Sequence, residues 1–112
     1  MITNKTRKTV IAKNHYNFKS PFSKAIGLMF SMNPKNLIFI FKKEKIVPLH
    51  MFFVIFPIDV LFIDKNKKVV DLKENFRPFT LYTPKAKSMY IIELPKSTIK
   101  KSKTRLSDII SF

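Results

Sequence analysis

A long apolar run between Leu49 and Asp64 is the feature that most constrains how this chain can fold. The run is rich in phenylalanine, valine and isoleucine, which favour the pleated surface of a β-strand. Pro57 interrupts it, because proline lacks an N–H group and breaks a hydrogen-bonded ladder or a helix. The pattern therefore predicts two strands, at about Leu49–Ile55 and Ile58–Asp64, joined by a bend at this proline.

The residues that follow the run predict a hairpin. Asp64-Lys65-Asn66-Lys67 has the composition of a tight turn, and Lys68–Leu72 is expected to return as the partner strand. Both central strands are apolar on both faces, which is typical of strands covered on two sides. The cover could be a helix, a second sheet or a ligand. A membrane span is not expected, because a proline, an aspartate and several lysines interrupt the apolar run.

A short helix is predicted near the N-terminus, at about Pro21–Phe30. Ser20 is a natural N-cap, and proline suits the first helical position because its missing N–H costs nothing there. Further strands, predicted from their aromatic and β-branched content, lie at about Arg7–Lys13, Leu37–Phe41, Lys87–Leu94 and around Ile109-Ile110.

Two stretches carry weaker patterns. Ser97–Lys103 is expected to form a short helix or a turn, and Leu72–Thr83 an irregular stretch punctuated by prolines. Together these elements predict a mainly β (β-rich α+β) fold, a small single-domain barrel or sandwich with one short N-terminal helix. The domain is expected to span residues 1–112, with a basic N-terminal arm at about residues 1–6.

The net charge of +15, from 22 basic and 7 acidic residues, is the strongest compositional signal. A field of this sign attracts polyanions, so weak nucleic-acid or other polyanion binding is one expected interaction. The excess of lysine, with abundant asparagine and isoleucine, equally fits a compositional bias of the genome. No cysteine is present, which excludes disulfides and thiol catalysis. With no secretory signal or transmembrane segment evident, we expect a cytoplasmic protein.

Several motifs together resemble a known family. They are Ala25-Ile26-Gly27-Leu28-Met29-Phe30, Leu37-Ile38-Phe39-Ile40-Phe41, Pro57-Ile58-Asp59-Val60-Leu61-Phe62-Ile63-Asp64 and Met89-Tyr90-Ile91-Ile92-Glu93-Leu94-Pro95. Their order and spacing are similar to those of domain-of-unknown-function family 192, which is widespread in bacteria and archaea. The resemblance covers about residues 8–110 and implies a compact, mostly β fold with one short helix and no established activity.

The chain departs from the family pattern at three places. Phe52-Phe53-Val54 stands where a polar Lys-Asn-Thr is common in the family. A glycine often found after the final Glu-Leu-Pro is replaced by Lys96-Ser97, and a Gly-Asp pair near the end by Ser107-Asp108. If the polar family segment serves a site, this chain lacks that site or uses it differently.

Asp59 is the most conspicuous polar residue, because apolar neighbours flank it on both sides. It could act as a general acid or base if burial raised its pKa, with His50 as a weak candidate partner. The favoured interpretation is a structural carboxylate that accepts backbone N–H groups at the Pro57 bend, since no nucleophile or partner base is evident. The histidine spacing matches no metal-ligand pattern, and the single glycine excludes phosphate-cradling loops, so we expect neither a metal nor a cofactor.

The stretch from Phe76 to Lys87 interleaves aromatic and basic residues on a predicted loop. Its candidate binding residues are Arg77, Phe79, Tyr82 and Lys85. The aromatic rings could stack on a base or sugar while the cations hold phosphates. The alternative is a packed loop whose aromatic residues cover a sheet edge.

Three functions remain open from the sequence. The first is a non-enzymatic ligand-binding or interaction module that uses this loop and the basic surface. The second is an enzyme with a site around Asp59 and His50. The third is a non-specific nucleic-acid-associated basic protein. The preferred hypothesis is the binding module, with enzymatic activity uncertain and the balance against it.

Overall fold

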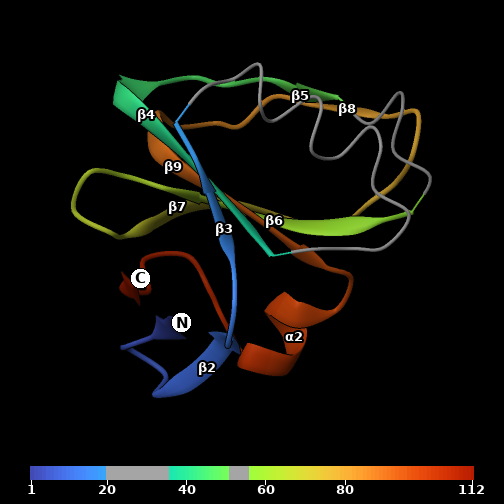
Figure 1. Ribbon diagram of the computed structural model, residues 1–112. Helices are drawn as coiled ribbons and strands as arrows, with labels where there is room; N and C mark the ends of the chain where they lie inside the picture. The colour runs from blue at the N-terminus through green and yellow to red at the C-terminus, as the bar shows by residue number, and fades with distance from the viewer. Residues whose placement is uncertain (20–35, 51–55) are drawn as a thin grey trace.

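The computed structural model describes residues 1–19, 36–50 and 56–112, with only the backbone of His50 included (Figure 1). A five-stranded sheet forms its centre, in the strand order β3-β4-β9-β6-β7. These strands span Tyr16–Phe18 (β3), Leu37–Lys45 (β4), Ser88–Pro95 (β9), Ile58–Ile63 (β6) and Val69–Phe76 (β7). All neighbours are antiparallel except β3 and β4. Every residue of β6 is buried, which explains its unbroken apolar sequence.

Smaller elements cover both faces of this sheet (Figure 1). On one side lie a three-stranded sheet in the order β10-β1-β2 and a short helix, α2. On the other side lies a two-stranded ribbon of β5 and β8. The bounds of these elements are Ile2–Asn4 (β1), Thr9–Ala12 (β2), Leu49–His50 (β5), Leu81–Tyr82 (β8), Thr98–Ser102 (α2) and Ile110–Ser111 (β10).

Two hydrophobic clusters lie on opposite faces of the central sheet. Val60 and Phe62 of β6 belong to the cluster that includes Leu49, on the β5 side. Leu61 and Ile63 belong to the cluster that includes Ile2, on the β1 side. Alternate residues of one strand therefore enter different cores, as the period of two in a β-strand requires. A second sheet and a helix are the cover on the β1 side.

Most of the strands predicted from the sequence are confirmed. Observed strands overlap the expected ones in β2, β4, β5, β6, β7, β9 and β10, and α2 falls within the expected helix or turn. The fold is mainly β, as predicted, but its described sheets are open and do not close into a barrel. The predicted helix at 21–30 and most of the predicted strand at 49–55 lie outside the described residues. No helix in the described part of the chain is long and apolar enough to cross a membrane.

The expectation of an irregular stretch from Leu72 to Thr83 was wrong. β7 continues to Phe76, and β8 follows at Leu81–Tyr82. Pro78 and Pro84 prompted that expectation, but both lie outside these two strands. β7 is an edge strand of the central sheet, where polar side chains such as those of Lys73 and Glu74 can reach water. At the other end of the chain, the segment expected as a basic arm contains β1, which is part of a sheet.

Candidate ligand-binding groove

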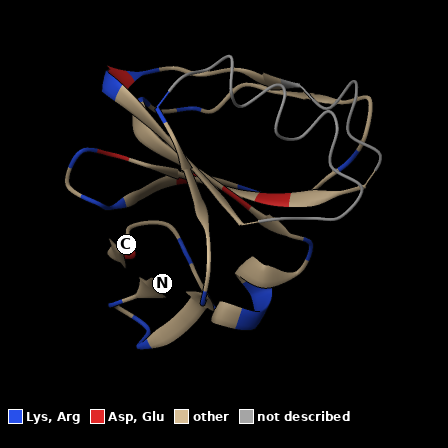
Figure 2. Ribbon diagram, viewed as in Figure 1, with Lys and Arg blue, Asp and Glu red and all other residues tan. Residues whose placement is uncertain are grey.

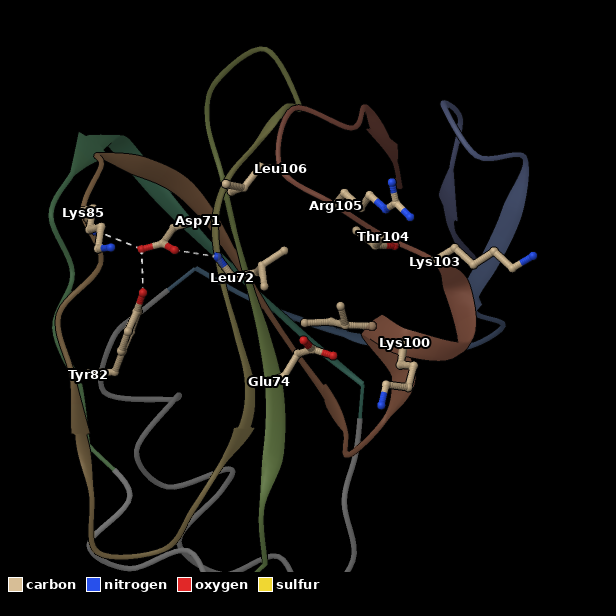
Figure 3. A pocket seen from close by; sticks show the side chains of 11 residues that line it. Asp71, Leu72, Glu74, Tyr82, Lys85, Lys100, Lys103, Thr104, Arg105 and Leu106 are labelled. Carbon is tan, nitrogen blue, oxygen red and sulfur yellow. Dashed lines mark hydrogen bonds between the residues drawn. The ribbon is translucent and has the colours of Figure 1, made fainter.

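A groove of about 600 Å³ lies at the edge strand β7, with β8 and the segment after it on one side of this strand and α2 with the segment after it on the other (Figure 3). Its lining residues are Asp71, Leu72, Glu74, Tyr82, Lys85, Ile99, Lys100, Lys103, Thr104, Arg105 and Leu106. The groove thus joins two parts of the chain that lie far apart in the sequence. Three buried carboxylates hold its parts in place, and each accepts at least one backbone N–H group.

Asp71 organises the first wall. Its Oδ2 atom accepts hydrogen bonds from the Tyr82 hydroxyl at 2.8 Å and the Lys85 backbone N–H at 2.9 Å, while Oδ1 accepts the Leu72 N–H at 2.8 Å (Figure 3). Burial raises the pKa of Tyr82 to about 12, aided by the hydrogen bond to Asp71 and the charge of that carboxylate. The phenol therefore remains a proton donor at neutral pH, and its contact fixes β8 against β7.

Asp59 joins two of the elements that line the groove, β7 and α2. Its Oδ1 accepts the Asn75 N–H at 3.0 Å, and its Oδ2 accepts the Ile99 N–H in the first turn of α2 at 2.9 Å. The β6–β7 register shifts between Ile58 and Val60, and Asn75 has a positive φ of 51°. This irregularity is where the Asn75 N–H meets the carboxylate rather than a backbone carbonyl. One buried side chain thereby ties β7 to α2.

Asp108 supports the far wall. Its Oδ2 accepts the Arg105 backbone N–H at 2.9 Å, the Asn4 side-chain amide at 2.9 Å and the Arg7 Nε–H at 3.1 Å. Burial alone would raise the pKa of Asp108, but these hydrogen bonds and the charge of Arg7 outweigh it and hold the pKa below its ordinary value. The Asn4 amide also donates to Thr104 Oγ1 at 3.0 Å, which fixes the groove-lining threonine.

The groove that results carries more cations than anions. Lys85, Lys100, Lys103 and Arg105 contribute four exposed positive charges, whereas the exposed acid of the lining is Glu74. Asp71 is buried and already holds three hydrogen bonds. Apolar side chains complete the lining at Leu72, Ile99 and Leu106. A groove of this kind suits a small anion with a short apolar part, held by the rim cations.

Two of the four predicted binding residues line the groove. Tyr82 and Lys85 lie together on the Asp71 wall, whereas Arg77 and Phe79 are outside the lining, with Phe79 72% exposed. The sequence reasoning missed Asp71 and the cations of the segment after β9. Asp71 carried the signal that singled out Asp59, an acid directly after apolar residues, but its contact with Tyr82 depends on how β8 folds back.

Asp59 and His50 lie on strands of different sheets. Asp59 lies on β6 of the central sheet, and His50 lies on β5, where it pairs with Leu81 of the two-stranded ribbon. Asp59 accepts backbone N–H groups, but from Asn75 and Ile99 rather than at the Pro57 bend. Within residues 1–19, 36–50 and 56–112, no group of three His, Asp or Glu residues is placed to hold a metal ion.

Fold and groove together define a class, a small layered β domain with a cation-rimmed groove built on buried aspartates. The chain belongs to domain-of-unknown-function family 192, described as "Uncharacterized ACR", whose model matches residues 3–112. The resemblance drawn from the motifs is therefore confirmed. None of the curated proteins matches the chain.

Two solved structures share the fold. One is a protein of Sinorhizobium meliloti 1021, provisionally described as a transcription regulator; the two chains are 24% identical, with a TM-score of 0.76 over 85% of this chain and 78% of that one. The other is a protein of unknown function from Novosphingobium aromaticivorans, 16% identical, with a TM-score of 0.80 over 88% of this chain and 74% of that one. At these identities the likeness shows the fold alone.

Proposed function

We propose that the protein is a non-enzymatic binding module that holds a small anionic ligand in the groove between β7 and α2. The observation that carries this proposal is that Lys85, Lys100, Lys103 and Arg105 all line one space of about 600 Å³. Figure 3 shows Lys85 on the other side of β7 from Lys100, Lys103 and Arg105, so the groove reaches across this edge strand. A carboxylate or phosphate group beside these cations gains charge-assisted hydrogen bonds.

The arrangement of the acids supports binding over catalysis. Both oxygens of Asp59 and both of Asp71 accept hydrogen bonds, mainly from backbone N–H groups. A carboxylate occupied in this way stabilises the fold and is poorly placed to exchange protons with a substrate. The apolar residues Leu72 and Leu106 favour a ligand with a small hydrophobic portion.

The test is a titration of the protein with inorganic phosphate, succinate and adenosine monophosphate, followed by isothermal calorimetry. The groove variant combines Lys85→Gln and Lys103→Gln, which leaves the Lys85 backbone N–H and its bond to Asp71 in place. The control combines Lys13→Gln and Lys96→Gln, two exposed lysines outside the groove lining that remove the same charge.

We expect saturable binding of at least one probe, weakened about tenfold or more in the groove variant and little changed in the control, because two charge-assisted contacts are lost. Equal loss in both variants, or no saturable binding of any probe, would overturn the proposal. Heat-induced unfolding of each variant shows whether the fold has been kept.

A further inference from the structure

A row of exposed lysines lies along one edge of the molecule, away from the groove (Figure 2). We define the lysine edge as Lys42, Lys43, Lys45, Lys65, Lys68 and Lys87. Three come from the end of β4, two from the turn between β6 and β7, and one from the residue before β9. None of them lines the groove described above.

Contacts in the structure show that these segments adjoin. The Lys65 backbone N–H donates to Glu44 Oε2 at 2.9 Å, which joins the β6–β7 turn to the end of β4. Lys45 pairs with Ser88, which brings Lys87 to the same edge. Beside them, Lys19, Phe41, Lys42, Lys43 and Lys45 surround a hollow of about 420 Å³. The three segments that carry the lysines are therefore neighbours, and Lys42, Lys43 and Lys45 of the row line the hollow.

Acids do not balance this charge. The edge holds Glu44 and Asp64 against six lysines, and both acids accept backbone hydrogen bonds. Asp64 Oδ1 accepts the N–H groups of Asn66 at 2.9 Å and Lys68 at 3.0 Å, so it shapes the turn that presents the lysines. A salt bridge from Glu44 or Asp64 to any of the six lysines does not occur within the described residues. The Lys45 ammonium group lies over the Phe41 ring, 4.8 Å from its centroid. The ammonium groups of the other five lysines remain available to an external polyanion.

The neighbouring side chains select among polyanions. A single strand is held largely by aromatic stacking, but the exposed aromatic residues of the described chain are Tyr16 and Phe79, both remote from this edge. Tyr16 lies at the opposite end of β4, paired with Leu37, and Phe79 lies beyond the far end of β7. Insertion into a membrane needs a large apolar surface, whereas Ile46 beside the row is only 42% exposed.

We propose that the lysine edge binds the phosphate backbone of double-helical nucleic acid without reading its sequence. Lysine ammonium groups act as point charges on phosphates, and such contacts position a protein on a duplex but carry no sequence information. The Cα atoms extend at most 33 Å along the longest axis of the molecule, which is close to one turn of a duplex, roughly 34 Å. One protein therefore covers at most about ten base pairs.

The test measures fluorescence anisotropy of a labelled 20-base-pair duplex, a single strand of the same length, and anionic vesicles over a salt series. The edge variant combines Lys42→Gln, Lys43→Gln and Lys65→Gln. The charge-matched control combines Lys13→Gln, Lys96→Gln and Lys101→Gln, which are exposed lysines near the ends of β2 and β9 and on α2.

We expect the duplex to bind more tightly than the single strand or the vesicles. Because each phosphate contact contributes about 0.9 to the slope of log affinity against log salt, the edge variant should lower that slope by roughly 2.7 and the control by much less. Affinity of the edge variant at low salt should fall at least tenfold. Equal losses of duplex affinity in the two variants would show that the net charge alone attracts the duplex, and would overturn the proposal. Tighter binding of single strands or vesicles than of the duplex would also overturn it.

Discussion

Two serines of this chain have left-handed backbone angles, a conformation that glycine adopts more easily. Ser97, just before α2, has a φ of 74°, and Ser107, just before Asp108, has a φ of 72°. Left-handed angles of this kind place the Cβ atom of an L-residue close to its own carbonyl, at about 1–2 kcal/mol, whereas glycine has no Cβ atom. These positions coincide with the two sites where the family pattern often has glycine.

We therefore expect Ser97→Gly and Ser107→Gly each to stabilise the protein by about 0.5–1 kcal/mol, the relief of strain less the entropy that glycine gains in the unfolded chain. Urea unfolding would measure the change. Ser111→Gly provides the control, because Ser111 lies in β10 and glycine weakens a strand. Destabilisation by all three substitutions would contradict the argument.

Tyr82 offers a second test at the level of one residue. Its hydroxyl donates to the buried Asp71 carboxylate, and its pKa is raised to about 12. Tyr82→Phe should cost about 2 kcal/mol at neutral pH, the usual contribution of a hydrogen bond to a charged group. The pKa is higher in the folded than in the unfolded state, so this stabilisation is complete below about pH 10 and is lost as pH rises toward 12.

Urea unfolding at pH 7, 10 and 11.5 should accordingly show the difference between wild type and Tyr82→Phe shrinking as pH rises. Absorbance at the wavelength of tyrosinate should show one phenol of the three titrating near pH 12 in the wild type and missing in the variant. A difference in stability that stays constant across this range would show that the hydroxyl contributes nothing through Asp71.

At the scale of elements, the groove depends on how β7 is joined to α2. α2 has five residues, too few to be stable alone, and its N-cap residue Ser97 makes no side-chain capping bond. The Asp59 carboxylate takes over part of that role by accepting the Ile99 N–H, and it also accepts the Asn75 N–H of β7. The position of this short helix is therefore set from β6.

Asp59→Ala should destabilise the protein by about 3–4 kcal/mol, because it leaves the buried Ile99 N–H and the partly buried Asn75 N–H without acceptors. Asp59→Asn should cost less, about 2 kcal/mol, since its carbonyl oxygen still accepts one of them. Urea unfolding would give the ranking, and amide hydrogen exchange should show faster exchange at Ile99 in both variants. Equal stability of wild type and Asp59→Ala would show that the carboxylate does not stabilise the fold.

The elements also show what the sequence could and could not predict. Strands β4, β6 and β9 were predictable because their aromatic and β-branched residues are buried on both faces. The polar end of β7 was not, since Lys73–Asn75 satisfy local loop rules and only pairing with β6 makes them a strand. The groove was half predictable. Tyr82 and Lys85 stood out in the sequence, whereas Lys103 and Arg105 reach the same groove only through long-range packing.

At the scale of the whole molecule, the two ends of the chain are held together. β1 pairs with β10, with Thr3 opposite Ser111, and Lys5 N–H donates to the Ile109 carbonyl at 2.8 Å. Buried beneath them, Asn4 and Asp108 form a hydrogen bond across 104 positions of sequence. Contacts of such long range order the groove wall at Thr104 and Arg105 only when the ends have met.

Asp108→Asn tests this closure. The pKa of Asp108 is lower in the folded than in the unfolded state, so the carboxylate stabilises the fold fully above its ordinary pKa, and this stabilisation is lost as pH falls through the lowered one. Because Arg7 is partly exposed, at 36%, we expect a cost of about 2–3 kcal/mol at pH 7, somewhat below that of a fully buried pair. Urea unfolding should show the cost shrinking between pH 5 and pH 2.

Glu74→Gln is the matched control, because it removes the same charge from an exposed position. It should change stability by less than about 0.5 kcal/mol at pH 7. Both substitutions raise the already high net charge of +15, so comparing the two variants separates the Asp108 contact from the general effect of charge. If Asp108→Asn and Glu74→Gln respond to pH alike, acid acts on the molecule through overall repulsion, and the contact between its ends has no special part. If the difference in unfolding free energy between wild type and variant narrows at low pH only for Asp108→Asn, the acid-sensitive contact lies where the first and last strands meet. That place is also the wall of the groove.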